Sequence, residues 1–220
     1  MSSTKSGNYQ TTVTSIREIA PKVSLLTFKR NWSFIAGQVV GIAIDLGDNP
    51  RMYTLSGSMD GKDAEIIFDV KPEGSLTPRL SKLKVGDKLL VSEPFGEFIG
   101  SRKPAWWIAT GTGIAPFASM LRSGFHEDKK LIHGGRHANS FYFKDEFKKM
   151  LGKNYIRCCS RDIDDDLYFG RVTDWLVDQP DIPTDIQYYL CGSAEMVVDV
   201  RDLLISREVP FENIQSEIFF

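Results

Sequence analysis

From about residue 103 onward, the chain alternates apolar, strand-like segments with helix-like ones, and this alternation is the strongest constraint on its fold. The strand-like segments are AWWIAT, KKLIHGG, YIRCCS and IQYYLCG, and each is followed by a helix-like segment such as IAPFASMLRSG or AEMVVDVRDLLISR. Strands that alternate with helices indicate parallel strands joined by crossover helices. Residues 103–220 are therefore predicted to form an α/β domain built on a parallel sheet.

The first hundred residues follow a different pattern, with many short strand-like segments. These segments are rich in β-branched and apolar residues, and turn clusters such as GDNP and MDGKD separate several of them. They are TTVTSIREI, KVSLLTFKR, QVVGIAID, MYTLSGS, AEIIFDVK and KLLVSEPFG. Many short strands with regular turns are typical of an antiparallel barrel. We therefore expect a two-domain chain, with an antiparallel β-barrel over residues 1–102 and one short helix near residues 77–81.

Composition narrows the classes of function. The formal net charge of −2 argues against a nucleic-acid binder, which usually carries a basic excess. No stretch approaches the roughly 18 apolar residues of a membrane helix, and the polar N-terminus lacks the apolar core of a signal peptide. Three cysteines make a poor disulfide framework and do not supply four ligands for an iron–sulfur cluster. We expect a cytoplasmic monomer that binds neither nucleic acid nor membranes and contains no metal site.

The sharpest local motif follows the strand AWWIAT. Gly111 and Gly113, on either side of Thr112, let the backbone turn tightly and approach a ligand with no β-carbon in the way, and Pro116 suits the first turn of a helix. The exposed N–H groups of such a helix start favour a phosphate. The third glycine of the usual dinucleotide fingerprint is absent, so an ordinary strand-to-helix turn is the alternative interpretation.

Two further signals lie at the ends of later strands. Cys191 and Gly192 end a strand and precede a helix, and ligands bind at the carboxyl ends of parallel strands. Taken alone, Cys191 is a small buried residue rather than a reactive one. Arg136, Ser160 and Arg161 follow two successive strands, and arginine with a hydroxyl suits the 2′-phosphate of NADP(H). Solvated loop residues are the alternative for either arginine alone.

The predicted barrel contains two weaker signals of its own. Arg51 and Tyr53 lie on one face of a strand, where a cation could neutralise a pyrophosphate and a ring could stack on a flat heterocycle. GSLT, at residues 74–77, precedes the short helix and is a second candidate phosphate cradle, although a glycine and serine before a helix also form a common cap.

In combination these segments resemble the ferredoxin–NADP reductase superfamily along almost the whole chain, and the bacterial type most of all. The resemblance rests on FIAGQ, RMYT, GSLT, GDKLLVSEPFGEF, ATGTGIAPF, SR, CGS and SEIFF, which occur in that order. It implies a flavin-binding barrel that holds FAD, followed by a nucleotide-binding domain that takes NADP(H).

The resemblance also implies roles for single residues of the barrel. Tyr53 stacks on one flavin face, and Thr54 contacts the redox-active edge, although serine is usual at that position. The remaining residues implied in FAD binding are Arg51, Met52, Val70, Lys71, Gly74, Ser75, Leu76 and Thr77.

In the second domain, the implied roles concern the nicotinamide and the end of the chain. The turn from Gly111 to Pro116, with Cys191 and Gly192, guides the nicotinamide toward the flavin. Glu217, Phe219 and Phe220 close the second flavin face, although tyrosine is more common at the place of Phe219. A hypothesis follows that this C-terminal tail gates turnover by moving aside for the nicotinamide.

The implied activity is hydride transfer between NADP(H) and bound FAD, with electrons exchanged singly with ferredoxin or flavodoxin. Three alternatives remain at this point: a reductase of free flavin, a reductase component of an oxygenase system, and a flavin-binding sensor without enzymatic activity.

Overall fold

The computed structural model describes residues 9–219 and divides the chain into two compact units, with the division between Ile99 and Gly100. The sequence pattern placed this division after Arg102. Among the described residues, no helix is long and apolar enough to cross a membrane. Phe220, which the sequence implicates in flavin binding, lies outside the described residues.

The first unit is a six-stranded antiparallel sheet in the order β4-β3-β6-β1-β2-β5. A bridge between Leu55, directly after β4, and Ile66 of β5 brings the two ends of this order together, so the sheet closes as a barrel. Its elements are β1 (Tyr9–Ala20), β2 (Val23–Lys29), β3 (Val39–Ala43), β4 (Arg51–Thr54), β5 (Asp63–Asp69), α1 (Thr77–Leu80) and β6 (Lys88–Val91).

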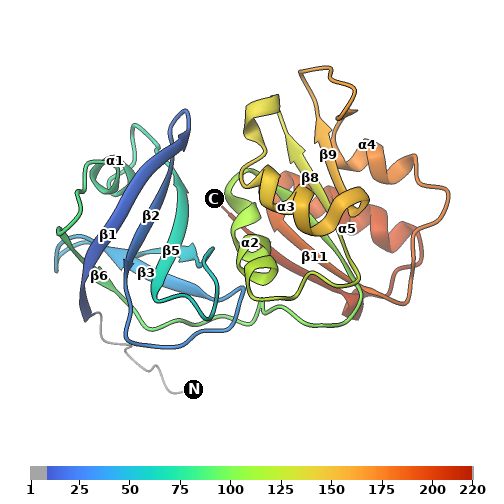
Figure 1. Cartoon of the computed structure of the whole chain (residues 1–220). Coiled ribbons are helices and arrows are strands. Elements are labelled where there is room, and N and C mark those ends of the chain that lie inside the picture. Colours follow the sequence, from blue (N-terminus) through green and yellow to red (C-terminus); the bar gives the residue numbers. More distant parts are fainter. Residues whose placement is uncertain (1–8, 220) are drawn as a thin grey trace. The chain divides into compact units, whose positions relative to one another are not determined.

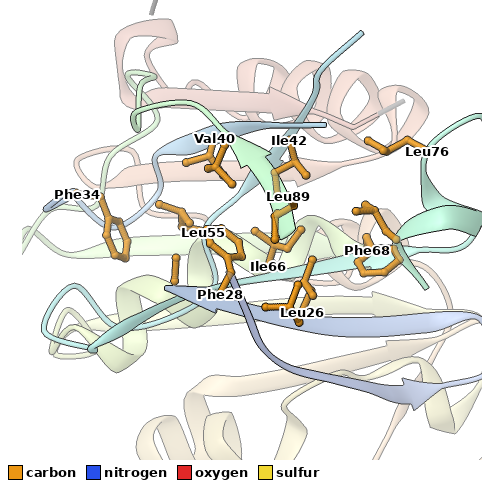
Figure 2. Packing of buried hydrophobic residues seen from close by; sticks show 14 residues of the cluster. Leu26, Phe28, Phe34, Val40, Ile42, Leu55, Ile66, Phe68, Leu76 and Leu89 are labelled. Atoms are coloured by element: carbon orange, nitrogen blue, oxygen red, sulfur yellow. The ribbon is translucent and has the colours of Figure 1, made fainter. Parts of the chain in front are cut away.

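Apolar side chains fill the barrel because alternate residues of each strand point inward. Figure 2 shows this packing, with side chains from β2, β3, β5 and β6 meeting in one cluster. The buried cluster includes Leu26, Phe28, Val40, Ile42, Ile66, Phe68, Leu76 and Leu89. Leu76 belongs to the GSLT segment, so the core anchors the candidate phosphate cradle directly.

The second unit is a parallel six-stranded sheet in the order β10-β9-β8-β7-β11-β12. Figure 1 shows β8, β9 and β11 within this sheet. The strands are β7 (Ala105–Thr110), β8 (Lys129–Gly135), β9 (Tyr155–Cys159), β10 (Tyr168–Phe169), β11 (Gln187–Gly192) and β12 (Ile214–Ile218). The chain begins at β7, moves outward through β8 and β9, and returns to the other side of β7 as β11. The direction of winding therefore changes between β7 and β11, where ligands bind in sheets of this kind.

Helices cover both faces of the parallel sheet. Trp106 packs against Trp175 of α4 (Val172–Val177), with ring centroids 5.7 Å apart. The next residue, Trp107, stacks on Phe117 of α2 (Ala115–Arg122), with centroids 5.5 Å apart. Neighbouring residues of a strand point to opposite faces, so α2 and α4 lie on opposite sides of β7. The helices are α2 (Ala115–Arg122), α3 (Lys144–Leu151), α4 (Val172–Val177) and α5 (Ala194–Ser206), with short 3-10 turns η1 (Gly111–Ile114), η2 (Ala138–Ser140), η3 (Gly152–Asn154) and η4 (Phe211–Asn213).

These two sheets confirm the fold class expected from the sequence. The expectation omitted two strands of the second unit, β10 and β12, which pair with β9 and β11. β10 has only two residues, and β12 is the polar segment IQSEI, half exposed along the edge of the sheet. Neither segment has the apolar run that marks the central strands.

Candidate functional site

In the second unit, the candidate site is the carboxyl edge of the sheet between β7 and β11. The η1 turn follows β7 and packs against the end of β11 so closely that a β-carbon on Gly113 would overlap the carbonyl oxygen of Cys191. Gly111 has a φ of 56°, in the left-handed region that favours glycine, and a β-carbon there would meet open space. The glycines thus have separate roles, because one permits close packing and the other keeps the turn open on its outer side.

The other predicted residues of this turn lie at the same edge. Thr112 is half-buried, and Pro116 is buried in the first turn of α2. Proline lacks an N–H, but the N–H groups of the first turn have no partner within the helix, so no helical hydrogen bond is lost.

A buried hydroxyl adds a polar group that sequence reasoning missed. Thr110 is the last residue of β7, and its buried Oγ1 has no hydrogen-bond partner among residues 9–219. A β-carbon on Gly192 would overlap this oxygen, so the glycine allows Thr110 to pack directly against the end of β11. A buried polar group without a partner is costly unless a ligand or water completes its bonding.

The end of the chain lies beside Cys191. β12 pairs with β11 in parallel, and this pairing sets Glu217 opposite Cys191. The N–H of Phe219 donates a 2.8 Å hydrogen bond to the carbonyl oxygen of Gly192. The structure therefore brings Gly113, Cys191 and the tail together, as three segments that are far apart in the sequence.

The chemical state of Cys191 follows from its surroundings. The residue is fully buried, and its pKa is raised well above the ordinary value by burial, with a further contribution from the nearby charge of Glu217. Because the thiolate is the nucleophilic form of cysteine, this thiol is inert at neutral pH. Cys191 can shape and seal the site without acting as a nucleophile.

The residues predicted to read a 2′-phosphate lie at the ends of β8 and β9. Arg136 and Arg161 are exposed, and neither guanidinium forms an ion pair within the described part of the chain. Ser160 is half-buried, and its N–H donates to the carbonyl oxygen of Gly135 at 3.1 Å. Two free cations on neighbouring loops form a surface that can bind a dianion.

In the barrel, β4 presents its residues in different environments. Arg51 is exposed and has no ion pair within residues 9–219, whereas Thr54 is 2% exposed. Tyr53 is half-buried and packs edge-to-face on Phe68, with centroids 6.3 Å apart. Burial raises the pKa of Tyr53 to about 12, so its phenol is neutral at physiological pH. Met52, between them, is 70% exposed.

The segment from Val70 to Thr77 closes on itself. The N–H of Lys71 donates to Oγ1 of Thr77 at 2.9 Å, and the N–H of Gly74 donates to the carbonyl oxygen of Lys71 at the same distance. A β-carbon on Gly74 would lie only 3.1 Å from that carbonyl oxygen. Val70 packs on the barrel core, while Ser75 is exposed. The segment is therefore a compact loop with an exposed outer side.

Arg79 links this loop to β4, and sequence reasoning missed it. Its guanidinium donates to Asp48 at 2.7 Å and to Asp45 at 2.6 Å, and both acids lie in the turn that precedes Arg51. This hydrogen-bonded guanidinium lowers the pKa of Asp48 to about 2. The loop that ends in Thr77 and the turn that precedes β4 are thus fastened together through Arg79. Two acids in the turn and an arginine after GSLT were the available signal, but the pairing between them is not local in sequence.

Comparison with known proteins identifies relatives that match most of the chain. Residues 107–202 match the family model described as the oxidoreductase NAD-binding domain. A flavodoxin/ferredoxin–NADP reductase of Escherichia coli K12 is 32% identical over 193 residues, which cover 76% of this chain and 77% of that protein. A toluate 1,2-dioxygenase electron transfer component of Pseudomonas putida is 26% identical over 98% of this chain and 69% of that protein.

The fold has matching solved structures as well. A ferredoxin NADP+ reductase from Neisseria gonorrhoeae, solved with bound FAD and NADP, superposes with a TM-score of 0.88 at 20% identity and covers 98% of this chain and 100% of that one. The family resemblance expected from the order of the motifs is confirmed. Two compact units, the oxidoreductase domain match and the relative of 32% identity lead to one conclusion. The chain belongs to the ferredoxin–NADP reductase family of oxidoreductases.

Proposed function

We propose that this protein is an FAD-dependent reductase that transfers hydride between NADP(H) and bound FAD, and exchanges electrons singly with a ferredoxin or a flavodoxin. The observation that carries the proposal is the meeting of the η1 turn, Cys191 and the Glu217–Phe219 tail at the carboxyl edge of β7 and β11. The E. coli relative, named a flavodoxin/ferredoxin–NADP reductase, supports the choice of reaction.

The barrel residues fit a flavin dinucleotide. The unpaired guanidinium of Arg51 can neutralise a pyrophosphate, and the neutral ring of Tyr53 can lie against a flat heterocycle. The compact Val70–Thr77 loop adds backbone groups on an exposed surface, and Arg79 holds this loop near the turn that leads into β4. Such residues would hold FAD through its phosphates and its ring.

The second unit fits a dinucleotide that carries an additional phosphate. The open backbone at Gly111 can approach a ligand, because a β-carbon there would meet nothing within 4 Å. Arg136, Ser160 and Arg161 would bind the 2′-phosphate, because two unpaired guanidinium groups and a hydroxyl suit a dianion. We assign NADP(H) rather than NAD(H) on this set of residues.

In this reaction the bound cofactors supply the hydride chemistry, and the protein supplies orientation and exclusion of water. Cys191, neutral and buried, offers a surface that excludes water without competing as a nucleophile. The hydrogen bond from Phe219 to Gly192 fixes the path of the tail at the edge of the nicotinamide region. Correct orientation alone can lower a barrier by several kcal/mol, so small shifts of these residues should reduce the rate.

The proposal is tested with the purified protein and its bound flavin. We expect FAD to remain bound through gel filtration and NADPH to support faster reduction of a ferredoxin or flavodoxin than NADH. The variant Arg161→Ala should raise the KM for NADPH and leave the KM for NADH nearly unchanged, because only NADPH carries the 2′-phosphate. A protein that stays colourless after incubation with FAD would contradict the proposal and favour a reductase of free flavin.

A second candidate is a reductase component of an oxygenase system, favoured by the match to the Pseudomonas putida component over 98% of the chain. Both candidates share the flavin chemistry and differ in the acceptor. Turnover with an oxygenase component or its ferredoxin, but not with flavodoxin, would select the second candidate. The three free cysteines suit a reducing compartment, so we propose a cytoplasmic location for either.

A further inference from the structure

The loops that follow β8 and β9 leave the sheet side by side. β8 and β9 are parallel neighbours, and their last paired residues are Gly135 and Cys159. Figure 1 shows the two strands adjacent in the sheet. Arg136 begins the first loop and Arg161 lies near the start of the second. The two cations proposed for the 2′-phosphate lie on two separate loops. They can bind one phosphate only if these loops keep a fixed position relative to each other.

Asp162 connects these loops through both oxygens of its carboxylate. Oδ2 accepts a 2.8 Å hydrogen bond from the N–H of Ala138, and Oδ1 lies 3.0 Å from Nδ1 of His137. The bond from Ala138 is the largest cause of the lowered pKa of Asp162, followed by His137. The first loop has internal order, since the N–H of Ser140 donates to the carbonyl oxygen of His137 at 2.9 Å.

The position of this acid is unexpected for a phosphate site. A carboxylate next to Arg161 in sequence should weaken the binding of a dianion through simple charge repulsion. Asp165 carries the same charge in the same loop and forms no side-chain hydrogen bond or ion pair with residues 9–219. Asp162 thus differs from its neighbour in geometry rather than in charge.

We propose that Asp162 is a positioning residue that fastens the loop of Arg136 to the loop of Arg161, so that both guanidinium groups bind one 2′-phosphate. This inference rests on the proposed function. Its geometric basis is a carboxylate of one loop that binds a backbone N–H and an imidazole of the other.

The proposal predicts the sign of an effect, because positioning and charge repulsion act in opposite directions. Asp162→Ala removes the connection and should weaken the binding of 2′-phospho-AMP about tenfold, the equivalent of about 1.4 kcal/mol. Asp162→Asn removes the charge but keeps an oxygen for the N–H of Ala138, so its affinity should stay near that of the wild type. Asp165→Ala, the matched control, should leave the affinity unchanged or raise it slightly.

Calorimetric titration of the FAD-loaded protein with 2′-phospho-AMP and with AMP measures these effects without turnover. AMP affinity should be the same in all variants, and the KM for NADPH should rise in Asp162→Ala with little change in kcat. Unchanged or tighter binding of 2′-phospho-AMP by Asp162→Ala would overturn the inference. Equal weakening for AMP would also overturn it, because the damage would then not be specific to the phosphate.

The same titrations distinguish this inference from the function on which it rests. If the wild type binds 2′-phospho-AMP no better than AMP, the NADP(H) assignment fails, and the positioning role fails with it. If the wild type prefers 2′-phospho-AMP and Arg161→Ala abolishes the preference, while Asp162→Ala retains it, only the positioning role fails.

Discussion

The buried histidine of β8 should make the second unit sensitive to mild acid. His133 is 0% exposed, and its Nδ1 lies 3.0 Å from the hydroxyl of Tyr155. Its Nε2 is buried and has no hydrogen-bond partner among the described residues. Burial, with a smaller contribution from Arg157, lowers the pKa of His133 from 6.5 to about 3. The folded state therefore holds the neutral imidazole, whereas the unfolded state takes up a proton at a pKa near 6.5.

The magnitude follows from the difference between the two pKa values. Above pH 6.5 the imidazole of His133 is neutral in both states, so it contributes no pH dependence to the stability. Between pH 6.5 and 3 the unfolded state binds more protons, so stability falls as the pH falls, by about 1.4 kcal/mol for each pH unit. At pH 5 the loss is about 2 kcal/mol, a sizeable part of a total stability of about 5–15 kcal/mol.

Urea denaturation at pH 7 and pH 5 tests this prediction, with His133→Gln as the comparison. Three of the four tryptophans lie in the second unit, so tryptophan fluorescence reports mainly on its unfolding. The carboxylates titrate in both proteins, so the difference between their pH dependences isolates His133. We expect the wild type to lose about 2 kcal/mol more than the variant. Parallel pH dependences would refute the reasoning, as would an NMR titration that shows His133 protonated at pH 5.

Three further perturbations test the two halves of the candidate site. Arg79→Ala should lower the affinity for FAD while the melting temperature of the apoprotein changes little, and FAD titration by fluorescence quenching would measure it; unchanged affinity would show that the link between the loops is dispensable. Gly113→Ala should destabilise the second unit by about 1–3 kcal/mol, because its β-carbon would overlap the carbonyl of Cys191, and a denaturant midpoint equal to that of the wild type would count against that close contact. Deletion of residues 219–220 should strengthen NADP+ binding in calorimetry if the tail competes with the nicotinamide, and an unchanged Kd together with unchanged hydride-transfer kinetics would exclude the gating hypothesis.

The architecture could be predicted from local patterns because each domain has its own sequence pattern. The first domain shows short strands separated by turns, and the second shows apolar strands that alternate with helices. β7 is buried at five of its six positions, and such a continuous apolar run is typical of a strand covered on both faces. β12 lacks this run because it lies at the edge of the sheet, and β10 is too short to show a period. These edge strands depend on pairing with β11 and β9, which no local pattern encodes.

The parts of the candidate site that lie within a short sequence motif could be predicted. The parts that depend on a side chain pairing with a residue far away in the sequence could not. The sequence points to the Gly111–Gly113 turn and to Cys191 as candidates because both lie where a strand ends at or beside a glycine, and ligands bind at the carboxyl ends of parallel strands. Arg79 and Asp162 were missed because each joins a segment that is remote in sequence, 31 and 24 residues away. In the sequence, Arg79 and Asp162 look like ordinary surface charges, and only the folded positions of the loops show their partners.

The most direct test of the proposed function is rapid mixing of the FAD-loaded protein with NADPH under anaerobic conditions. We predict that the flavin absorbance bleaches in a fast phase, and that NADPH deuterated at the transferred position of C4 slows this phase. NADH should produce the same bleaching with weaker saturation, because it lacks the 2′-phosphate that Arg136 and Arg161 are proposed to bind. If NADPH leaves the oxidised flavin spectrum unchanged, the chain is not a hydride-transferring reductase, and a flavin-binding role without catalysis would take the place of this proposal.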